Sequence, residues 1–279
     1  MVVSRISDGL GNQMFQYACG YAVAQRLETD LLLDITILDN HPFRNFELNQ
    51  FQIEYSKIIS YKWLGWKSAI KAARILTEKK YQFFLETFKC EDAWKYDSSI
   101  MNVSTNTYLV GYWQSEKYFS PYRNDLLRIF TPSQNSEGCH QFIKRVSKSN
   151  SVSVHIRRGD YVQTGISISD TYYKEAFGRI SKMVEHPVFY IFSDDMEYAK
   201  TLMPTCGDYN CVYVTYDSKN TTIDDMTIMA RCKHNVIANS SFSWWGAWLN
   251  QNGEKIVIAP EVGNWKDDFY PESWIKIKL

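Results

Sequence analysis

The second half of the chain alternates short apolar runs with amphipathic stretches. Val152, Val154 and Ile156 alternate with polar residues, which is the period of a strand. Residues 188–192 are apolar throughout, as in a parallel strand that is covered on both faces. The pattern therefore predicts a parallel α/β sheet. Its predicted strands lie at 151–156, 188–192, 211–214, 235–238 and 256–259, and its predicted helices at 139–148, 170–184, 196–202 and 222–232.

The first half begins with a strand, a glycine-rich turn and a helix. The predicted strand covers residues 2–6, and the predicted helix runs from about Met14 to Glu28. A helix that follows such a turn presents its backbone N–H groups to a ligand. The turn lacks both the G-x-G-x-x-G pattern and a P-loop lysine. Asn12 either caps the helix or contacts a hydroxyl group in a cleft, and the residues alone leave both readings open.

The rest of the first half mixes short strands with aromatic and helical segments. Strands are predicted at 31–33 and 108–110, and the second of these leads into Tyr112 and Trp113. Those two rings suit either stacking on a sugar or packing in the core. Residues 61–85 combine apolar and lysine residues and predict a helical insertion that covers the sheet. The linker-like segment 131–138 favours two domains, 1–138 and 139–279.

Two adjacent arginines end the strand at 151–156. Arg157 and Arg158 are followed by Gly159, which lets the backbone turn sharply, and by Asp160. A guanidinium group forms two parallel hydrogen bonds to a phosphate or a carboxylate. In open α/β sheets, ligands bind beyond the carboxyl ends of the strands. We expect Asp160 to orient one arginine and leave the other for an anion; the alternative is a salt bridge that only caps the strand.

Polar groups also end two further strands of this half. One strand leads into Ser193-Asp194-Asp195, and another leads into Asn239-Ser240-Ser241-Phe242 at the start of a helix. Parallel strands bring these ends to one edge, where a helix N-terminus favours negative charge. A carboxylate there can accept both N–H groups on one edge of guanine. Together the three ends predict a nucleoside-diphosphate site with a preference for guanine.

Composition and charge reduce the number of partner classes that the chain is expected to bind. The 279 residues contain 31 Lys and Arg and 31 Asp and Glu, so no basic surface for nucleic acid is expected. The six cysteines show neither a C-x-x-C pair nor zinc spacing. Cys206 and Cys211 could approach each other, but free thiols are expected. No apolar run is long enough to span a membrane, which favours a cytoplasmic protein, or one peripheral to the inner face of a bacterial membrane.

Four motifs together resemble the α-1,2-fucosyltransferases of glycosyltransferase family 11. They are GLGNQMFQYA at 9–18, HIRRGDY at 155–161, FSDD at 192–195 and NSSFSWWGAWL at 239–249. The resemblance covers most of the chain. It implies a GT-B fold, which is two Rossmann-like halves with a cleft between them. It also implies inverting transfer of L-fucose from GDP-β-L-fucose to the 2-hydroxyl of a terminal β-galactoside, with no cofactor and no essential metal.

The same resemblance implies roles for particular residues. Arg157 would hold the β-phosphate, His155 would recognise the nucleotide, and Asp195 would bind guanine. Residues 1–138 would face the acceptor, and residues 139–279 would bind the GDP-sugar. The candidate catalytic residues are Arg157, Asn12 and Asp160. The candidate GDP-fucose contacts are Gly11, Asn12, His155, Arg157, Arg158, Asp195, Ser240, Ser241 and Phe242.

The chain departs from the family pattern at two places. Asp8 stands where the family more often has glycine, and the loop after Asp160 lacks a histidine that could serve as a base. The general base is therefore open. Asp160 is expected to give structural support first, because pairing with arginine would weaken it as a base.

Three other functions compete with this one. A transferase with another nucleotide-sugar donor would use the same clamp. A metal-dependent transferase or phosphatase would use Asp194 and Asp195 as ligands, although adjacent carboxylates point apart if they lie on a strand. A glycan-binding protein without catalysis would fit the aromatic content of 15%, but it does not need two arginines at a strand end.

Overall fold

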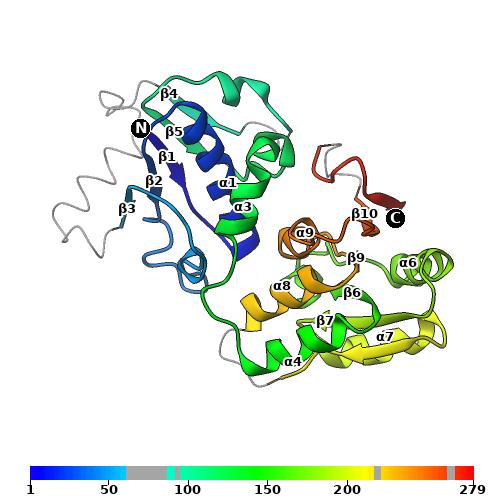
Figure 1. Ribbon diagram of the computed structural model, residues 1–279. Coiled ribbons are helices and arrows are strands. Elements are labelled where there is room, and N and C mark those ends of the chain that lie inside the picture. Colours follow the sequence, from blue (N-terminus) through cyan, green and yellow to red (C-terminus); the bar gives the residue numbers. More distant parts are fainter. Residues whose placement is uncertain (61–86, 92–94, 217–220, 263–267) are drawn as a thin grey trace. The chain divides into compact units, whose positions relative to one another are not determined.

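A computed structural model describes residues 1–60, 87–91, 95–216, 221–262 and 268–279. The chain divides into two compact units (Figure 1). One unit is Met1–Ser133 with Lys266–Pro271, and the other is Gln134–Trp265 with Glu272–Leu279. The sequence predicts two contiguous domains, 1–138 and 139–279. That prediction does not include the return of the chain to the first unit. The helical insertion predicted at 61–85 lies outside the described residues.

Parallel strands form the centre of the first unit. Over its described residues they follow the order β3-β2-β1-β5-β4. The strands are β1 (Val2–Arg5), β2 (Leu31–Asp34), β3 (Lys57–Ile59), β4 (Thr87–Cys90) and β5 (Thr107–Val110). The three central strands β1, β2 and β5 are mostly buried. Because the strands are parallel, their carboxyl ends lie at one edge of the sheet.

Helix α1 (Leu10–Arg26) follows β1 and begins four residues earlier than the sequence predicts. Gly9 is its N-cap residue, and the Gly9 carbonyl accepts hydrogen bonds from the N–H groups of Asn12 and Gln13. The reading of Asn12 as the cap is therefore wrong. The two glycines disguise the start of the helix, because glycine disfavours helix in the local pattern. Buried residues line nearly the whole helix, which tertiary packing stabilises.

Short helical elements complete the described part of the first unit. They are α3 (Arg123–Ile129) and the 3₁₀ turns Leu48–Gln50, Ser98–Asn102, Glu116–Tyr118 and Ser120–Tyr122. The returning segment packs into this unit, since the Phe269 ring lies 6.2 Å from that of Phe15.

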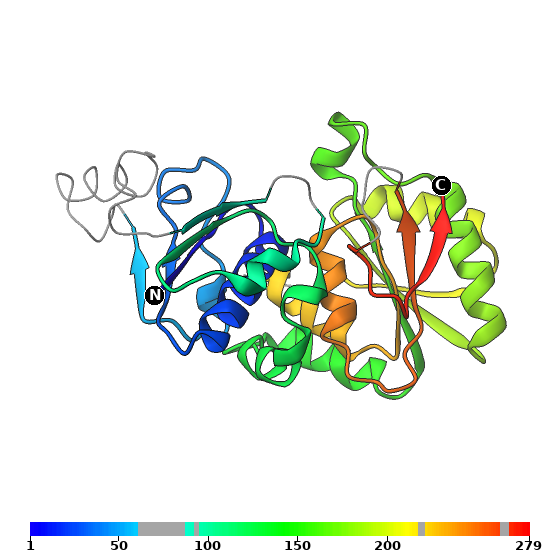
Figure 2. The ribbon, with the colours of Figure 1, turned by 90° about the horizontal axis from the view of Figure 1, so that it is seen from above.

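The second unit is a doubly wound parallel sheet. Its described strands follow the order β11-β10-β9-β6-β7-β8. Figure 2 shows β10 and β11 as neighbouring arrows that point the same way. The strands are β6 (Asn150–Ile156), β7 (Pro187–Ser193), β8 (Asn210–Tyr213), β9 (His234–Val236), β10 (Val257–Glu261) and β11 (Ile275–Lys278).

Helices cover both faces of this sheet, which explains why β7 is apolar throughout. Phe189 and Ile191 pack on one face with α6 and α7, whereas Tyr190 and Phe192 pack on the other with α4 and α8. The helices are α4 (Glu137–Val146), α5 (Gly159–Gln163), α6 (Asp170–Met183), α7 (Met196–Cys206), α8 (Thr221–Arg231) and α9 (Ser241–Trp248). The GT-B-like fold class is confirmed, with one Rossmann-like parallel sheet in each unit.

Much of the aromatic content belongs to the core. Trp244, Trp245 and Trp248 on α9 are fully buried, and the Trp244 and Trp248 rings are stacked with centroids 6.1 Å apart. Trp113 is also buried, so packing is the correct reading for this ring. The six cysteines, all in the described ranges, are free thiols. In the part of the chain that the structure describes, no helix is both long and apolar enough to cross a membrane.

Replacing each of two helix glycines with alanine is expected to change the stability of the protein in opposite directions. A Cβ added at Gly20 in α1 would lie 2.8 Å from the Ser4 Cβ, whereas one added at Gly178 in α6 meets nothing within 4 Å. Gly20→Ala should therefore destabilise the protein by about 1–3 kcal/mol through overpacking. Gly178→Ala should stabilise it by about 0.5–1 kcal/mol, because alanine loses less entropy in a helix. Urea unfolding measures both, and equal effects would contradict the close packing of α1 on β1.

Candidate functional site

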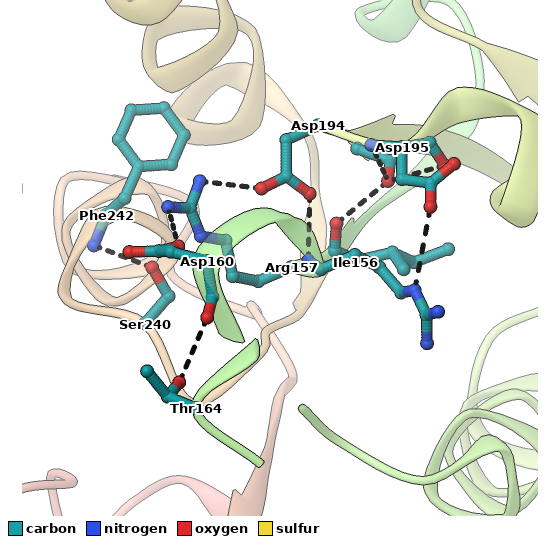
Figure 3. Close-up of polar contacts among 10 residues, drawn as sticks. Ile156, Arg157, Asp160, Thr164, Asp194, Asp195, Ser240 and Phe242 are labelled. Carbon is teal, nitrogen blue, oxygen red and sulfur yellow. Dashed lines mark hydrogen bonds and ion pairs between the residues drawn. The ribbon is translucent and has the colours of Figure 1, made fainter. Parts of the chain in front are cut away.

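Three segments meet at the carboxyl edge of the second sheet. Strand β6 ends at Ile156, and β7 beside it ends at Ser193. Ser193 Oγ donates to the Ile156 carbonyl at 2.9 Å and ties the two ends together. Helix α9 begins at Ser241, shortly after β9, which pairs with the other side of β6. Figure 3 shows the polar side chains that follow these ends.

The Arg157 guanidinium lies between two carboxylates (Figure 3). One terminal nitrogen is 2.5 Å from Asp160 Oδ1, and the other is 2.8 Å from Asp194 Oδ2. The expected pairing of Asp160 with an arginine is confirmed. The two bonds differ in exposure, because the Asp160 side chain is 51% exposed and that of Asp194 only 26%. Arg157 is therefore held firmly from the Asp194 side and loosely from the Asp160 side.

Asp194 binds two consecutive residues of the β6 end. In addition to the Arg157 side chain, it accepts a hydrogen bond from the Arg158 backbone N–H at 2.8 Å. Gly159 makes room for it, since a Cβ there would lie 2.6 Å from Asp194 Oδ2. The close approach of a carboxylate thus favours glycine here, whereas the turn does not require it, because Gly159 has no positive φ and begins α5.

Arg158 points to a different group of residues. Its Nε lies 3.7 Å from Asp195 Oδ2, and its guanidinium stacks over the Tyr198 ring at 3.7 Å from the centroid. Asp195 also caps α7, because its Oδ1 accepts the Tyr198 N–H at 3.0 Å. The expectation that Asp194 and Asp195 alternate along a strand is wrong, since β7 ends at Ser193 and both carboxylates lie beyond it.

His155 is buried beneath this edge and is uncharged. Burial, reinforced by the positive charge of Arg157, lowers the pKa of His155 to about 3. Its ring lies 5.6 Å from that of Phe242, and its Nδ1 is buried without a hydrogen-bond partner in the structure. A neutral imidazole with an unsatisfied nitrogen can hydrogen-bond a ligand, but it supplies no charge.

The N-terminus of α9 is partly occupied by its own cap. Ser240 Oγ accepts the Phe242 N–H at 3.3 Å, so neither group is wholly available to a ligand. Ser241 and Phe242 remain half-buried at the first turn. The end of the helix still favours an anion, because its dipole places partial positive charge there.

A further carboxylate lies at this edge and is absent from the sequence prediction. Asp225 lies on α8 directly after Asp224, the acidic residue of its first turn; α8 precedes β9 and so begins at the carboxyl edge of the sheet. It accepts the Tyr216 hydroxyl at 2.7 Å. Burial, with a smaller contribution from the charge of Asp224, raises the pKa of Asp225 to about 6. Tyr216 and Phe242 both pack against the apolar cluster that α4, β7 and α8 share. The signal available in the sequence was the acidic pair Asp224-Asp225 near the start of a helix.

Gly11 and Asn12 belong to the first unit. Both lie in the first turn of α1, where Gly11 is buried and Asn12 is half-buried. Asn12 Oδ1 accepts a hydrogen bond from Gln114 Nε2 at 2.9 Å. This bond fixes the amide plane of Asn12 and joins α1 to the segment that follows β5.

The second-unit edge suits an oxyanion better than a cation. It brings together two guanidinium groups and a helix N-terminus, which are the groups that bind phosphates. Three carboxylates, Asp160, Asp194 and Asp195, pair with the two guanidinium groups, so an incoming anion competes with them. Among the described residues, no three or more His, Cys, Asp or Glu side chains form a group that could hold a metal ion.

Two relatives match the chain over nearly its whole length, and a third matches about half of it. An alpha-1,2-colitosyltransferase from Escherichia coli is 32% identical, with 100% of this chain and 99% of the relative covered. The O-antigen biosynthesis glycosyltransferase WbnK from Escherichia coli is 31% identical, with 98% and 99% covered. The galactoside 2-alpha-L-fucosyltransferase Sec1 of Mus musculus is 27% identical, over 53% of this chain and 43% of its own.

Solved structures share the fold at low sequence identity. An Arabidopsis thaliana FUT1 mutant in complex with GDP has a TM-score of 0.56 at 11% identity and covers 94% of this chain and 71% of its own. The NodZ alpha-1,6-fucosyltransferase soaked with GDP-fucose has a TM-score of 0.52 at 15% identity, with 89% and 91% covered.

One family model spans nearly all of these elements. It is described as glycosyl transferase family 11, and it matches residues 1–278. The match takes in both sheets and all four motifs. The chain therefore belongs to glycosyl transferase family 11.

Proposed function

We propose that this glycosyltransferase is an inverting galactoside α-1,2-fucosyltransferase. It moves L-fucose from GDP-β-L-fucose to the 2-hydroxyl of a terminal β-galactoside, and no essential metal takes part. The family membership and the fucosyltransferases among the relatives and solved structures support this choice of donor. The galactoside acceptor is supported by the printed names of relatives such as Sec1.

The observation that carries the proposal is the clamp at the end of β6. Arg157 is oriented by Asp194. Two residues before it, the His155 ring lies 5.6 Å from that of Phe242 in the half-buried first turn of α9. A diphosphate leaving group gains negative charge as its bond to the sugar breaks. A positioned guanidinium and a helix N-terminus stabilise that charge, and such stabilisation is often the largest catalytic contribution.

The reaction is a single displacement at C1 of fucose. The acceptor oxygen forms a bond to C1 while the bond from C1 to the β-phosphate oxygen breaks. The hydroxyl proton passes to a base or to water, and GDP leaves with the bonding electron pair. Asn12 orients the acceptor hydroxyl rather than removing its proton, because an amide is not a base at neutral pH.

Asp160 pairs with a terminal nitrogen of Arg157 that the diphosphate of the donor would bind instead. Its side chain is the most exposed of the carboxylates around the two arginines, and an exposed ion pair contributes only about 0–1 kcal/mol. A diphosphate can therefore displace Asp160 at little cost while Asp194 keeps the guanidinium in place. Asp160 thus supports the clamp in the empty enzyme and gives way to the donor.

We assign the guanine contact to Asp225 instead of Asp195. Asp195 Oδ1 accepts the hydrogen bond that caps α7, and Oδ2 lies 3.7 Å from the Arg158 Nε in an ion pair that is too long for a hydrogen bond. Asp225 binds Tyr216 through Oδ1, and among the described residues its Oδ2 accepts no hydrogen bond. His155, with its unsatisfied Nδ1, adds a second nucleotide contact.

A second donor is favoured by one relative. The alpha-1,2-colitosyltransferase matches the whole chain, and colitose is L-fucose without its 3-hydroxyl. GDP-colitose would bind the same arginine clamp, since the two donors share the nucleotide and the diphosphate. Selectivity between the two donors would depend only on the residues around the sugar.

The first test is a nucleotide and donor panel. GDP should raise the melting temperature more than UDP, ADP or CMP, because only guanine offers two adjacent donors to a carboxylate. GDP-fucose should then give an α-1,2 product with a β-galactoside, identified by NMR, in the presence of excess chelator. Preference for another base would overturn the donor assignment. Faster transfer from GDP-colitose would favour the second donor, and loss of activity in chelator would favour the metal-dependent rival.

The second prediction concerns Arg157→Lys. Lysine keeps the charge but loses the fork that spans Asp194 and a phosphate. Turnover should fall at least ~100-fold while the protein stays folded, as when a positioned donor to a developing anion is lost. Arg179→Lys is the matched control, because Arg179 pairs with Glu175 on the exposed side of α6. Similar turnover in the two variants would remove Arg157 from the phosphate role.

The third prediction compares Asp225→Asn with Asp195→Asn. The amide places a donor where guanine also donates, so Asp225→Asn should weaken GDP binding by about 1–3 kcal/mol. Asp195→Asn should cost less, since asparagine caps α7 as well as aspartate does. Calorimetry with GDP measures both variants. A larger loss for Asp195→Asn would restore Asp195 as the guanine contact.

The same pair of variants has a pH signature. Only ionised Asp225 accepts guanine N–H groups, so GDP binding should lower the pKa of Asp225 below its free value of about 6. Affinity should consequently rise between pH 5 and pH 7 and then level off. Asp225→Asn should lose this part of the rise and retain only the titration of the phosphate itself.

A further inference from the structure

An aspartate in the first unit adopts a backbone conformation that favours glycine. Asp8, directly after β1, has a φ of 63°, in the left-handed region. A side chain other than glycine costs free energy in this conformation, and contacts of the carboxylate can offset that cost. Asp8 Oδ2 accepts hydrogen bonds from the Tyr112 hydroxyl at 2.9 Å and from Ser7 Oγ at 3.3 Å.

Two buried glutamines of the GLGNQMFQYA motif hold this turn in place. Gln13 Nε2 donates to the Asp8 carbonyl at 2.7 Å. Gln16 accepts the Ser7 N–H through Oε1 at 2.8 Å and donates through Nε2 to Ser7 Oγ at 2.9 Å. Both glutamine side chains are buried, so these bonds are shielded from water. The position of the Asp8 carboxylate is therefore fixed before any ligand arrives.

The Asp8 carboxylate lines a cavity of about 280 Å³. The cavity lies at the carboxyl ends of the central strands, where ligands of open α/β sheets bind. Its walls come from the ends of β1 and β5 and from the segment after β2, all within the first unit. They include Arg5, Asp8, Ile37, Leu38, Val110 and Tyr112. The volume is slightly below the roughly 300–1,000 Å³ that drug-sized ligands occupy, which suits a single sugar ring.

The cavity holds two opposite charges that do not meet. Arg5 and Asp8 both line it, yet no ion pair joins them, and no described carboxylate pairs with Arg5. Two half-buried charges left apart in this way suit a neutral ligand with several hydroxyl groups. Such a ligand donates to the carboxylate and accepts from the guanidinium.

The remaining walls combine apolar, aromatic and polar groups. Ile37, Leu38 and Val110 offer surface to the C–H face of a ring, and Tyr112 contributes both its ring and a hydroxyl that donates to Asp8. Ser7, Gln16 and His41 add polar groups. A pyranose likewise combines an apolar face with an equatorial belt of hydroxyls. Besides His41, the walls contain one basic residue, Arg5, whereas the site in the second unit has two arginines.

We propose that this cavity binds the hexopyranose ring of the acceptor, with Asp8 and Arg5 holding its hydroxyls. The proposal rests on the proposed function, because the acceptor is the sugar that must bind apart from the nucleotide clamp. Asp8 and Arg5 are then the residues that select the acceptor. The alternative source of such a ring is the 6-deoxyhexose of the donor.

The test combines kinetics with binding in the full chain. Asp8→Asn keeps a residue that tolerates positive φ but removes the charge, and Arg5→Gln removes the opposite charge. Both should raise the KM for methyl β-D-galactopyranoside at least tenfold. Both should leave the hydrolysis rate of GDP-fucose and its KM within twofold. Glu28→Gln is the matched control, because Glu28 is an exposed carboxylate residue in the same unit with a φ of 49°.

Saturation-transfer NMR tests the cavity independently of catalysis. Methyl β-D-galactopyranoside should receive saturation from the native chain, with or without GDP, and should lose it in Asp8→Asn. A KM within twofold of the native value in both variants would overturn the proposal. An effect confined to GDP-fucose hydrolysis would also overturn it and would place the donor sugar in the cavity. Failure of GDP to bind would count against the proposed function alone, because the NMR experiment needs no nucleotide.

Discussion

The second unit depends on one carboxylate that holds two consecutive arginines. Asp194 binds the Arg157 side chain and the Arg158 backbone, and Gly159 is a glycine because the carboxylate comes so close. Without this contact the turn after β6 would have no fixed direction, and the two guanidinium groups would not diverge. Arg157 faces the edge of the sheet, whereas Arg158 stacks on Tyr198. The two arginines are adjacent in the sequence, but their side chains contact different groups of residues.

A similar division of labour appears in the first unit. The buried glutamines of the motif after β1 are structural supports, whereas the Ser7–Asp8 turn that they hold is only half-buried. The side-chain amides of Gln13 and Gln16 form hydrogen bonds to the Ser7–Asp8 turn. Asn12 is oriented by a hydrogen bond from Gln114. A buried amide that loses one partner leaves the other unsatisfied, which costs more than the bond contributes. This asymmetry makes such a network a rigid support for a binding group.

The sequence was sufficient for the sheet and for the arginine clamp, because both depend on local patterns. Alternation predicts β6, continuous apolar character predicts β7, and Arg157 pairs with Asp160 three residues away. It was insufficient where a partner comes from another segment. The bond of Asp194 to Arg157, the caps of α1 and α7, and the Tyr216–Asp225 pair all depend on how loops fold in three dimensions. Likewise, nothing in the local pattern of residues 266–271 indicates that they return to the first unit.

That return affects how the enzyme can be recombined. The chain passes between the two units three times, since residues after Ser133 build the second unit, Lys266–Pro271 rejoin the first, and Glu272–Leu279 supply the edge strand β11. Phe269 packs on Phe15, so the aromatic core of the first unit contains a residue from near the C-terminus. A chimaera with a single crossover near residue 133 would join one parent's α1 to another parent's tail. Exchange of the whole first unit between family members therefore calls for three crossovers, so that this short segment is carried along with the N-terminal half.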